Sequence, residues 1–281
     1  MSEELKFETT ITARNGWFDI NFRELWKYRD LILLFVRRNF VALYKQTILG
    51  PAWAIIQPLL TTVVFTVVFG NLAGLSAKGV PAFLFFMSGT VAWGYFSGCL
   101  TQTANTFIGN AGILGKVYFP RLVMPISTVL TNIIPFLIQA MMFFAFFCYY
   151  WCKGAVSPNL YVCLIPLLIL HMALLGLGCG VIISALTIKY RDLAMLVGFG
   201  IQLWMYGTPV AYDMNIVPAK YMGYYMLNPM TPIINFFRYA FLGLGEVNWT
   251  YYGLSVGVTL FIFALGVILF SRVEKSFMDT I

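Results

Sequence analysis

Acidic residues are absent from most of this sequence. No Asp or Glu occurs between Asp30 and Asp192, and only 10% of the 281 residues are charged, against about 25% in a soluble domain. Carriers driven by protons or sodium commonly place carboxylates within the membrane. Magnesium sites and glycoside hydrolysis also depend on carboxylates. The sequence therefore argues against an ion-driven carrier and against an enzyme such as a membrane glycosyltransferase.

Histidine and cysteine give no metal or redox motif either. The one histidine, His171, has no acidic neighbour with which to form a proton relay, so we expect a hydrogen-bonded packing residue. The five cysteines lie in or beside apolar runs without CxxC spacing, which is typical of small apolar packing residues. We predict no catalytic residue and no metal ligand in this chain.

A nucleotide-binding loop is also missing, although one stretch is similar to it. The segment GNAGILGKVYFPRL (109–122) contains the pair Gly115-Lys116, but the phosphate-binding pattern requires an earlier glycine at position 110 and Ser or Thr at 117. These positions are Asn110 and Val117. We therefore expect no nucleotide or other cofactor in this chain, and the segment needs another explanation.

Long apolar runs dominate what is present, since 60% of the residues are hydrophobic. About 20 apolar residues cross a bilayer as a helix, and six such runs occur, at about 49–70, 81–107, 122–151, 160–188, 193–211 and 251–270. Two X-Pro steps interrupt the apolar region 213–247 and disfavour a continuous helix there. We predict an all-α integral membrane protein with a cytosolic segment 1–48, a six-helix membrane domain 49–281, and short re-entrant helices before the sixth span.

The basic residues predict the orientation, because cytoplasmic loops are enriched in Lys and Arg. With both termini in the cytosol, only Lys78, Lys153, Lys220 and Arg238 of the eighteen basic residues fall on the outer side. The net charge of +7 is thus explained by topology, and nucleic-acid binding is not needed to account for it. The segment 109–121 becomes a cytosolic loop.

The residues before the first span have an amphipathic pattern. No signal peptide is visible at the start, and the stretch 22–46 alternates apolar and basic residues at helical spacing. Such a helix lies in the membrane interface and favours anionic head groups. Arg37, Arg38 and Lys45 would meet a lipid head group where it enters from the inner leaflet. The alternative is a simple anchor that orients the first span.

Aromatic and basic residues occur together in the cytosolic loop. Tyr118 and Phe119 stand between Lys116 and Arg121, and Tyr and Arg in particular are enriched among the residues that dominate protein contacts. The loop is therefore a candidate surface for a protein partner. Ordinary residues of the membrane edge are the alternative.

Four motifs resemble the permease subunits of bacterial export-type ABC transporters that move O-antigen, capsule and teichoic-acid polysaccharides. They are YKQTILGPAWAIIQP (44–58), ILGKVYFPRLVMPIS (113–127), KYRDL (189–193) and LNPMTPIINFFRYAFLG (227–243), and the ending VEKSFMDTI (273–281) is also similar. The resemblance extends from about Trp17 to the last residue. It identifies the chain as a member of this group through the order and spacing of loose motifs.

The resemblance implies a homodimer of permease chains in the bacterial inner membrane, with two copies of a separate ATPase that binds ATP and magnesium. The cargo would be a lipid-linked polysaccharide, with O-antigen as the first expectation. The loop after the second span would dock on the ATPase, with KYRDL as a weaker contact and the re-entrant pair closing the outer side. The docking residues would be Leu114, Lys116, Val117, Tyr118, Phe119, Pro120 and Arg121.

Aromatic and amide side chains in the spans are candidates for the sugar pathway, because aromatic faces flanked by polar groups hold sugars weakly. Arg238, in the re-entrant stretch, would cap a helix end or meet an anionic group at the outer gate. The glycines of GLGCG (176–180) predict close helix packing. The pathway candidates are Trp53, Gln57, Trp93, Tyr95, Gln102, Asn132, Trp204, Tyr206 and Arg238, with Asn105 and Gln202 offering similar chemistry.

Two alternatives to polysaccharide export stay open at this stage. The same architecture could carry a small lipid or a drug, or the chain could be a passive channel that needs no partner. The sequence does not distinguish among O-antigen, capsule and teichoic acid as cargo.

Overall fold

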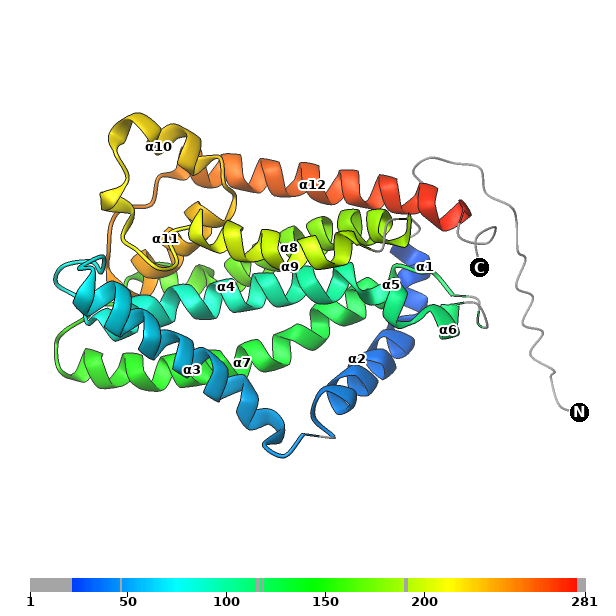
Figure 1. The fold of residues 1–281 in the computed structure, drawn as a ribbon, viewed down its shortest axis with the longest axis horizontal. Helices are drawn as coiled ribbons and strands as arrows, with labels where there is room; N and C mark the ends of the chain where they lie inside the picture. Colours follow the sequence, from blue (N-terminus) through cyan, green and yellow to red (C-terminus); the bar gives the residue numbers. More distant parts are fainter. Residues whose placement is uncertain (1–21, 46, 115–116, 118, 190–191, 277–281) are drawn as a thin grey trace, which may run out of the picture.

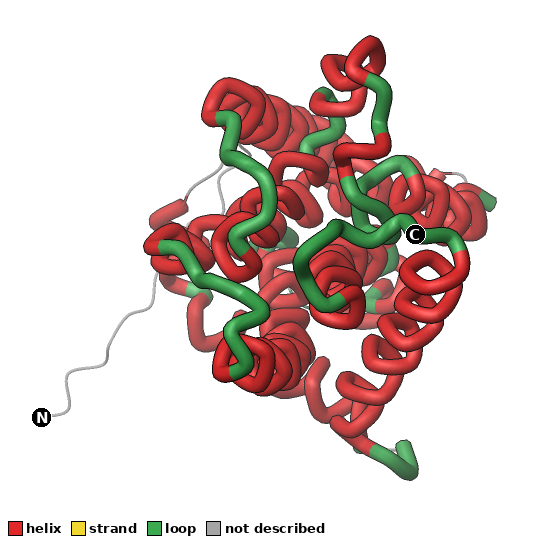
Figure 2. The backbone as a smooth tube through the Cα atoms, turned by 90° about the vertical axis from the view of Figure 1, so that its left-hand side faces the viewer, coloured by secondary structure: helices red, strands yellow, loops and turns green. Residues whose placement is uncertain are grey.

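A computed structural model describes residues 22–45, 47–114, 117, 119–189 and 192–276. These residues form helices joined by loops, and the described part of the chain contains no strand (Figures 1 and 2). The all-α prediction is confirmed. The α-helices are α1 (Phe22–Lys27), α2 (Arg29–Tyr44), α3 (Trp53–Phe65), α4 (Ala82–Ala104), α5 (Thr106–Gly109), α6 (Ala111–Leu114), α7 (Val123–Cys152), α8 (Ile165–Lys189), α9 (Leu193–Tyr206), α10 (Ala219–Met226), α11 (Met230–Leu242) and α12 (Trp249–Ser276).

Five of the six expected spans appear as helices long and apolar enough to cross a membrane. Among the described residues these are Gly50–Leu72, Ala82–Ala104, Val123–Cys152, Leu160–Thr187 and Trp249–Phe270. The first consists of α3 with a short 3-10 turn before it, Gly50–Ala52, and a π-helical end, Thr66–Leu72.

The expected span 193–211 is shorter in the structure. Its helix, α9, has 14 residues, which is about 21 Å at 1.5 Å per residue and less than the bilayer core of about 30 Å. The helix ends at Tyr206, with Gly207 as its C-cap, and Thr208 precedes Pro209, so the chain turns although the apolar sequence continues. Hydropathy alone does not predict that α9 ends before the apolar run does.

Helix α4 is the centre of the bundle. It is largely buried, and in the end-on view other helices surround the middle of the molecule (Figure 2). Helix α8 packs closely on it at the GLGCG glycines, because a Cβ placed on Gly176 would lie 2.7 Å from Cys99 Cβ. On its other side α8 meets α12, where a Cβ on Gly178 would lie 2.9 Å from Phe263 Cα. The predicted packing role of these glycines is confirmed.

The region 213–247 contains the two short helices α10 and α11, of 8 and 13 residues. Both are too short to cross a bilayer. In Figure 1 α10 lies at the end of the bundle opposite to α1, α5 and α6. Main-chain hydrogen bonds join the connections at the α10 end, since Asp213 N donates to Leu75 O (3.0 Å) and Asn159 N donates to Ala240 O (2.9 Å).

Candidate functional site

Helix α2 packs directly on the loop 109–121, which the charge pattern predicts to be cytosolic. Leu25 and Phe35 are buried together with Phe119, Val123 and Met124 in a small apolar cluster that is separate from the main core. The rings of Phe35 and Phe119 lie 5.7 Å apart between centroids. In Figure 1 α2 runs from the α5–α6 end toward the start of α3, and it is inclined to the bundle. The interface helix and the loop therefore share one hydrophobic core.

A hydrogen bond also joins α2 to the loop. Arg38 Nη2 donates to Asn110 Oδ1 at 2.6 Å and to Asn39 Oδ1 at 2.9 Å. The guanidinium lies over the Phe35 ring, 4.7 Å from its centroid, and partial burial lowers the pKa of Arg38 from its usual value. Asn110 in turn donates to Thr106 O at 2.7 Å. Arg38 thus ties the amphipathic helix to the loop.

The residues predicted to dock on the ATPase divide into two groups. Val117 is 56% exposed, whereas Phe119 is only 5% exposed and belongs to the α2 cluster. Pro120 and Arg121 are half-buried. The positions Lys116 and Tyr118 and the side chain of Leu114 lie outside the described residues. An exposed docking surface in the described part of the loop centres on Val117, with Ile108 of α5 also exposed.

The three residues predicted to meet a lipid head group also differ. Arg37 and Lys45 are exposed, whereas Arg38 is half-buried and bound to Asn110. Two exposed apolar side chains, Leu33 and Leu34, lie on the same helix. An exposed surface that mixes cations with leucines fits the head-group region of a membrane.

At the other end, Arg238 of α11 holds the turn that follows α9. It is 3% exposed, and its guanidinium donates to Val210 O (2.9 Å) and Tyr212 O (3.4 Å). It also contacts Ser88 Oγ (3.4 Å) and lies 3.7 Å from the Phe85 ring centroid. No carboxylate of a described residue lies within ion-pair distance of it. Arg238 therefore does not cap α11 but supplies donors to main-chain oxygens of another segment.

Asn228 joins the same turn to α11 through four hydrogen bonds. Its Oδ1 accepts from Trp204 Nε1 (2.9 Å) and Met230 N (3.1 Å), and its Nδ2 donates to Gly207 O (3.0 Å) and Thr208 Oγ1 (2.8 Å). Backbone outside a helix within a membrane must find its partners inside the protein. Asn228 and Arg238 are these partners for residues 207–212.

Residues of the α7–α8 connection and of α12 also hydrogen-bond to α11 and to the residue before it. Asn159 Nδ2 donates to Tyr239 O (3.1 Å), and Ser255 Oγ of α12 donates to Pro229 O (2.7 Å). Ser255 also approaches His171, whose Nε2 lies 2.9 Å from Thr259 Oγ1. The prediction of a hydrogen-bonded packing role for His171 is confirmed.

The pathway candidates do not form one surface. Trp93, Tyr95, Asn132 and Arg238 are buried, and Gln102 is paired with Asn132 through two hydrogen bonds of 2.9 and 3.1 Å. The exposed candidates are on α3 and α9: Trp53, Gln57 and Tyr206. Trp204 is half-buried, and exposed Asn105 bonds to Thr101 O. In this conformation the buried members pack the bundle, and the exposed ones offer their side chains to its surface.

Sequence reasoning missed Asn110 and Asn228, the two amides that join these segments. The nearest signal for Asn228 was the Asn-Pro step, since Asn is a frequent residue just before a helix. Asn110 was noted only because it breaks the phosphate-loop pattern. Their partners are distant in sequence, so no local pattern reveals them.

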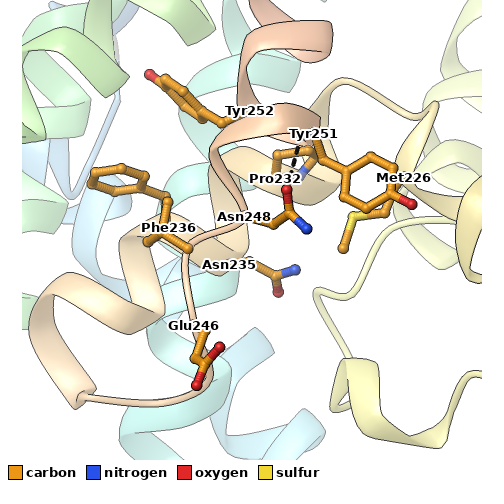
Figure 3. A pocket seen from close by; sticks show the side chains of 9 residues that line it. Met226, Pro232, Asn235, Phe236, Glu246, Asn248, Tyr251 and Tyr252 are labelled. Carbon is orange, nitrogen blue, oxygen red and sulfur yellow. Dashed lines mark hydrogen bonds between the residues drawn. The ribbon is translucent and has the colours of Figure 1, made fainter.

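A small pocket lies between α10, α11 and the start of α12 (Figure 3). Its volume of about 20 Å³ is close to the space that a single water molecule needs. Asn248 lies among the side chains that line the pocket. It also caps α12, because its Oδ1 accepts from Thr250 N (3.1 Å) and Tyr251 N (3.3 Å). The pocket is too small for a sugar ring.

Three known transport proteins are similar to this chain over most of its length. The chain is 27% identical over 251 residues to the O-antigen export system permease protein RfbA of Klebsiella pneumoniae, covering 89% of this chain and 94% of the relative. It is 29% identical over 224 residues to RfbA of Myxococcus xanthus, covering 78% and 83%. The polysialic acid transport protein KpsM of Escherichia coli is 20% identical over 236 residues, covering 83% and 89%.

The family match covers α2 through α11. Residues 30–242 correspond to the ABC-2 type transporter family. This range includes the loop 109–121, the first four of the five long helices, and the hydrogen-bond network of Asn228 and Arg238. Together with the apolar helices, the match describes a multi-pass protein of the bacterial inner membrane and the membrane subunit of a transporter. The chain belongs to the ABC-2 type transporter family.

Proposed function

We propose that this chain is the permease of an exporter that moves a lipid-linked polysaccharide, O-antigen in the first place, across the bacterial inner membrane. The observation that carries the proposal is the near full-length similarity to permeases named for O-antigen export, with 94% and 83% of two relatives covered. The acid-free stretch between Asp30 and Asp192 removes the usual ion-coupling groups from four of the expected spans. Energy then comes from a partner.

The proposed partner is a separate ATPase that binds ATP and magnesium and docks on the cytosolic loop. Two copies of the permease and two of the ATPase make the complete transporter. The loop is supported by α2 through Phe35–Phe119 packing and the Arg38–Asn110 bond. A loop held by these contacts transmits a movement of the ATPase to the membrane helices better than a flexible loop, because the loop itself deforms less.

The proposed pathway lies along the exposed faces of α3 and α9. Gln57 and Gln202 are exposed on apolar helices, and an amide side chain facing lipid tails is costly. We therefore place these faces toward the second copy of the permease, along the pathway between the two copies. Trp53 and Tyr206 lie on the same two helices and supply aromatic faces for sugar rings. Arg37 of α2 and Lys45, directly after this helix, would receive the anionic lipid head group at the cytosolic side.

The test is reconstitution of the chain with its ATPase in proteoliposomes that contain a lipid-linked O-antigen. We expect the sugar to reach the lumen, out of reach of an impermeant glycosidase, only when ATP is hydrolysed. Transport of a capsule polymer or teichoic acid in its place would change the cargo but keep the mechanism. Leakage of solutes through the chain alone would favour a passive channel and refute the proposal.

A further inference from the structure

Helix α9 is attached very differently at its two ends. Val197 and Ile201 lie half-buried against the core, whereas Met195 and Phe199 are 85% and 63% exposed. Among the described residues, Trp204 is the one α9 side chain with a hydrogen bond to another segment, and the main chain directly after α9 is bonded to the same partner, Asn228. Apolar contact is not directional, so it allows the helix to tilt.

The outer end of α9 is held by directional bonds. Trp204 Nε1 donates to Asn228 Oδ1, and its indole contacts Phe96 and Trp93 with centroid distances of 5.1 and 6.3 Å. Asn228 Nδ2 also donates to Gly207 O and Thr208 Oγ1 directly after the helix. Two donors and two acceptor positions are all the amide offers, so Asn228 is fully used.

The support of Asn228 is itself fixed. Its Oδ1 accepts from Met230 N at the start of α11. Helix α11 is in turn bonded to α12 by Ser255, to the α7–α8 connection by Asn159, and to α4 by Arg238. Asn228 therefore joins the end of α9 to the start of α11, and α11 is itself bonded to α12, to the α7–α8 connection and to α4.

We propose that Asn228 is a positioning residue that makes the outer end of α9 a pivot. The helix then tilts about Trp204, and its cytosolic half moves most. Met195 lies about 14 Å along the axis from Trp204, so a tilt of about 10° displaces it by about 2.5 Å. The inner mouth of the pathway changes width while the outer closure stays shut. This inference rests on the proposed function only for the statement that α9 borders the pathway.

The test measures the two ends of α9 in the same chain. Spin labels are placed on Met195→Cys or Tyr206→Cys and on native Cys152, which is exposed. The remaining accessible cysteines are replaced by serine, and labelled chains are diluted with unlabelled ones in nanodiscs. Without nucleotide, we expect a broad distance distribution for the pair with residue 195 and a narrow one for the pair with residue 206.

Variants of the amide separate a pivot from general stability. Trp204→Phe removes the indole N–H but keeps the ring, and Asn228→Ala removes all four bonds. Both should broaden the distribution at residue 206 to about that at residue 195, without loss of the α-helical signal. Asn228→Asp keeps the acceptor for Trp204 and should broaden it less. The matched control is Asn215→Ala, because the Asn215 amide donates to Asp213 Oδ2, two residues away.

Equal widths at residues 195 and 206 in the native chain would overturn the inference, as would variants that leave residue 206 unchanged. Addition of the ATPase with ATP is a separate arm. If the pivot is present but nucleotide moves neither label, the proposed ATP-driven function is contradicted and the pivot remains supported by the nucleotide-free data.

Discussion

The bond between Arg38 and Asn110 gives a quantitative prediction for ATPase docking. Removing it should free the loop from α2 and lower the fraction of chains whose loop is ready to dock. A buried hydrogen bond to a charged group contributes about 1.5–3 kcal/mol. Arg38 is half-buried and keeps Asn39 as a second acceptor, so we expect about 1 kcal/mol, which is a factor of about five in affinity.

The assay is the dissociation constant of the ATPase subunit for the permease in nanodiscs. Arg38→Met and Asn110→Leu should each raise it about five-fold, and the double variant should raise it no further, because either change alone breaks the bond. Arg29→Met is the control on the same helix, since Arg29 makes an exposed 3.8 Å ion pair with its neighbour Asp30 and lies over the Trp26 ring, 5.9 Å from its centroid. Additive effects of the two variants would refute the idea that this bond braces the loop.

Three further predictions concern the loop, the pathway and the outer closure. Val117→Asp should abolish stimulation of the ATPase without changing thermal stability, whereas Phe119→Asp should also lower the melting temperature because it buries a carboxylate in the α2 cluster. Gln57→Leu should slow sugar transport at unchanged stability. By contrast, Asn132→Leu should cost about 0.6–1.7 kcal/mol per lost interhelical bond, measured by denaturation. Arg238→Met should reduce the folded yield, since it leaves main-chain oxygens without donors at about 1–3 kcal/mol each; normal yield and transport would contradict its assigned role.

The sequence predicted the long helices well because hydropathy is a local property. Five of six runs became helices of spanning length, and the apolar segment with two X-Pro steps became α10 and α11. The remaining run, 193–211, ends early, because its helix stops before Gly207. Its missing last turn is replaced by bonds from Asn228 and Arg238, which lie 21 and 31 positions later. A pattern read over a window of 20 residues cannot include such partners.

The candidate site was predictable as a set of segments but not as a set of side chains. Composition and residue order predict the loop 109–121, the helix α2 before the first span, and a break of the apolar region 213–247 into short helices; that these short helices are re-entrant stays a prediction. Which aromatic residues face outward was not, because Trp93 and Trp53 have the same chemistry but different depths in the bundle, at 6% and 48% exposure. Depth depends on how α4 is surrounded, and no residue of α4 reveals that by itself.

Arg238 has one consequence for how the turn after α9 evolves. Its partners at Val210 and Tyr212 are main-chain oxygens, which every amino acid at those positions would provide. Selection for these bonds acts on the path of the backbone, and the side chains of Val210 and Ala211, which are buried in the main core, are restricted by packing instead. Gly89 is different, since a Cβ at that position would lie 2.9 Å from Arg238 Nη2. A saturation scan should therefore find that Val210 accepts apolar side chains of similar size, whereas Arg238 and Gly89 accept almost no substitution.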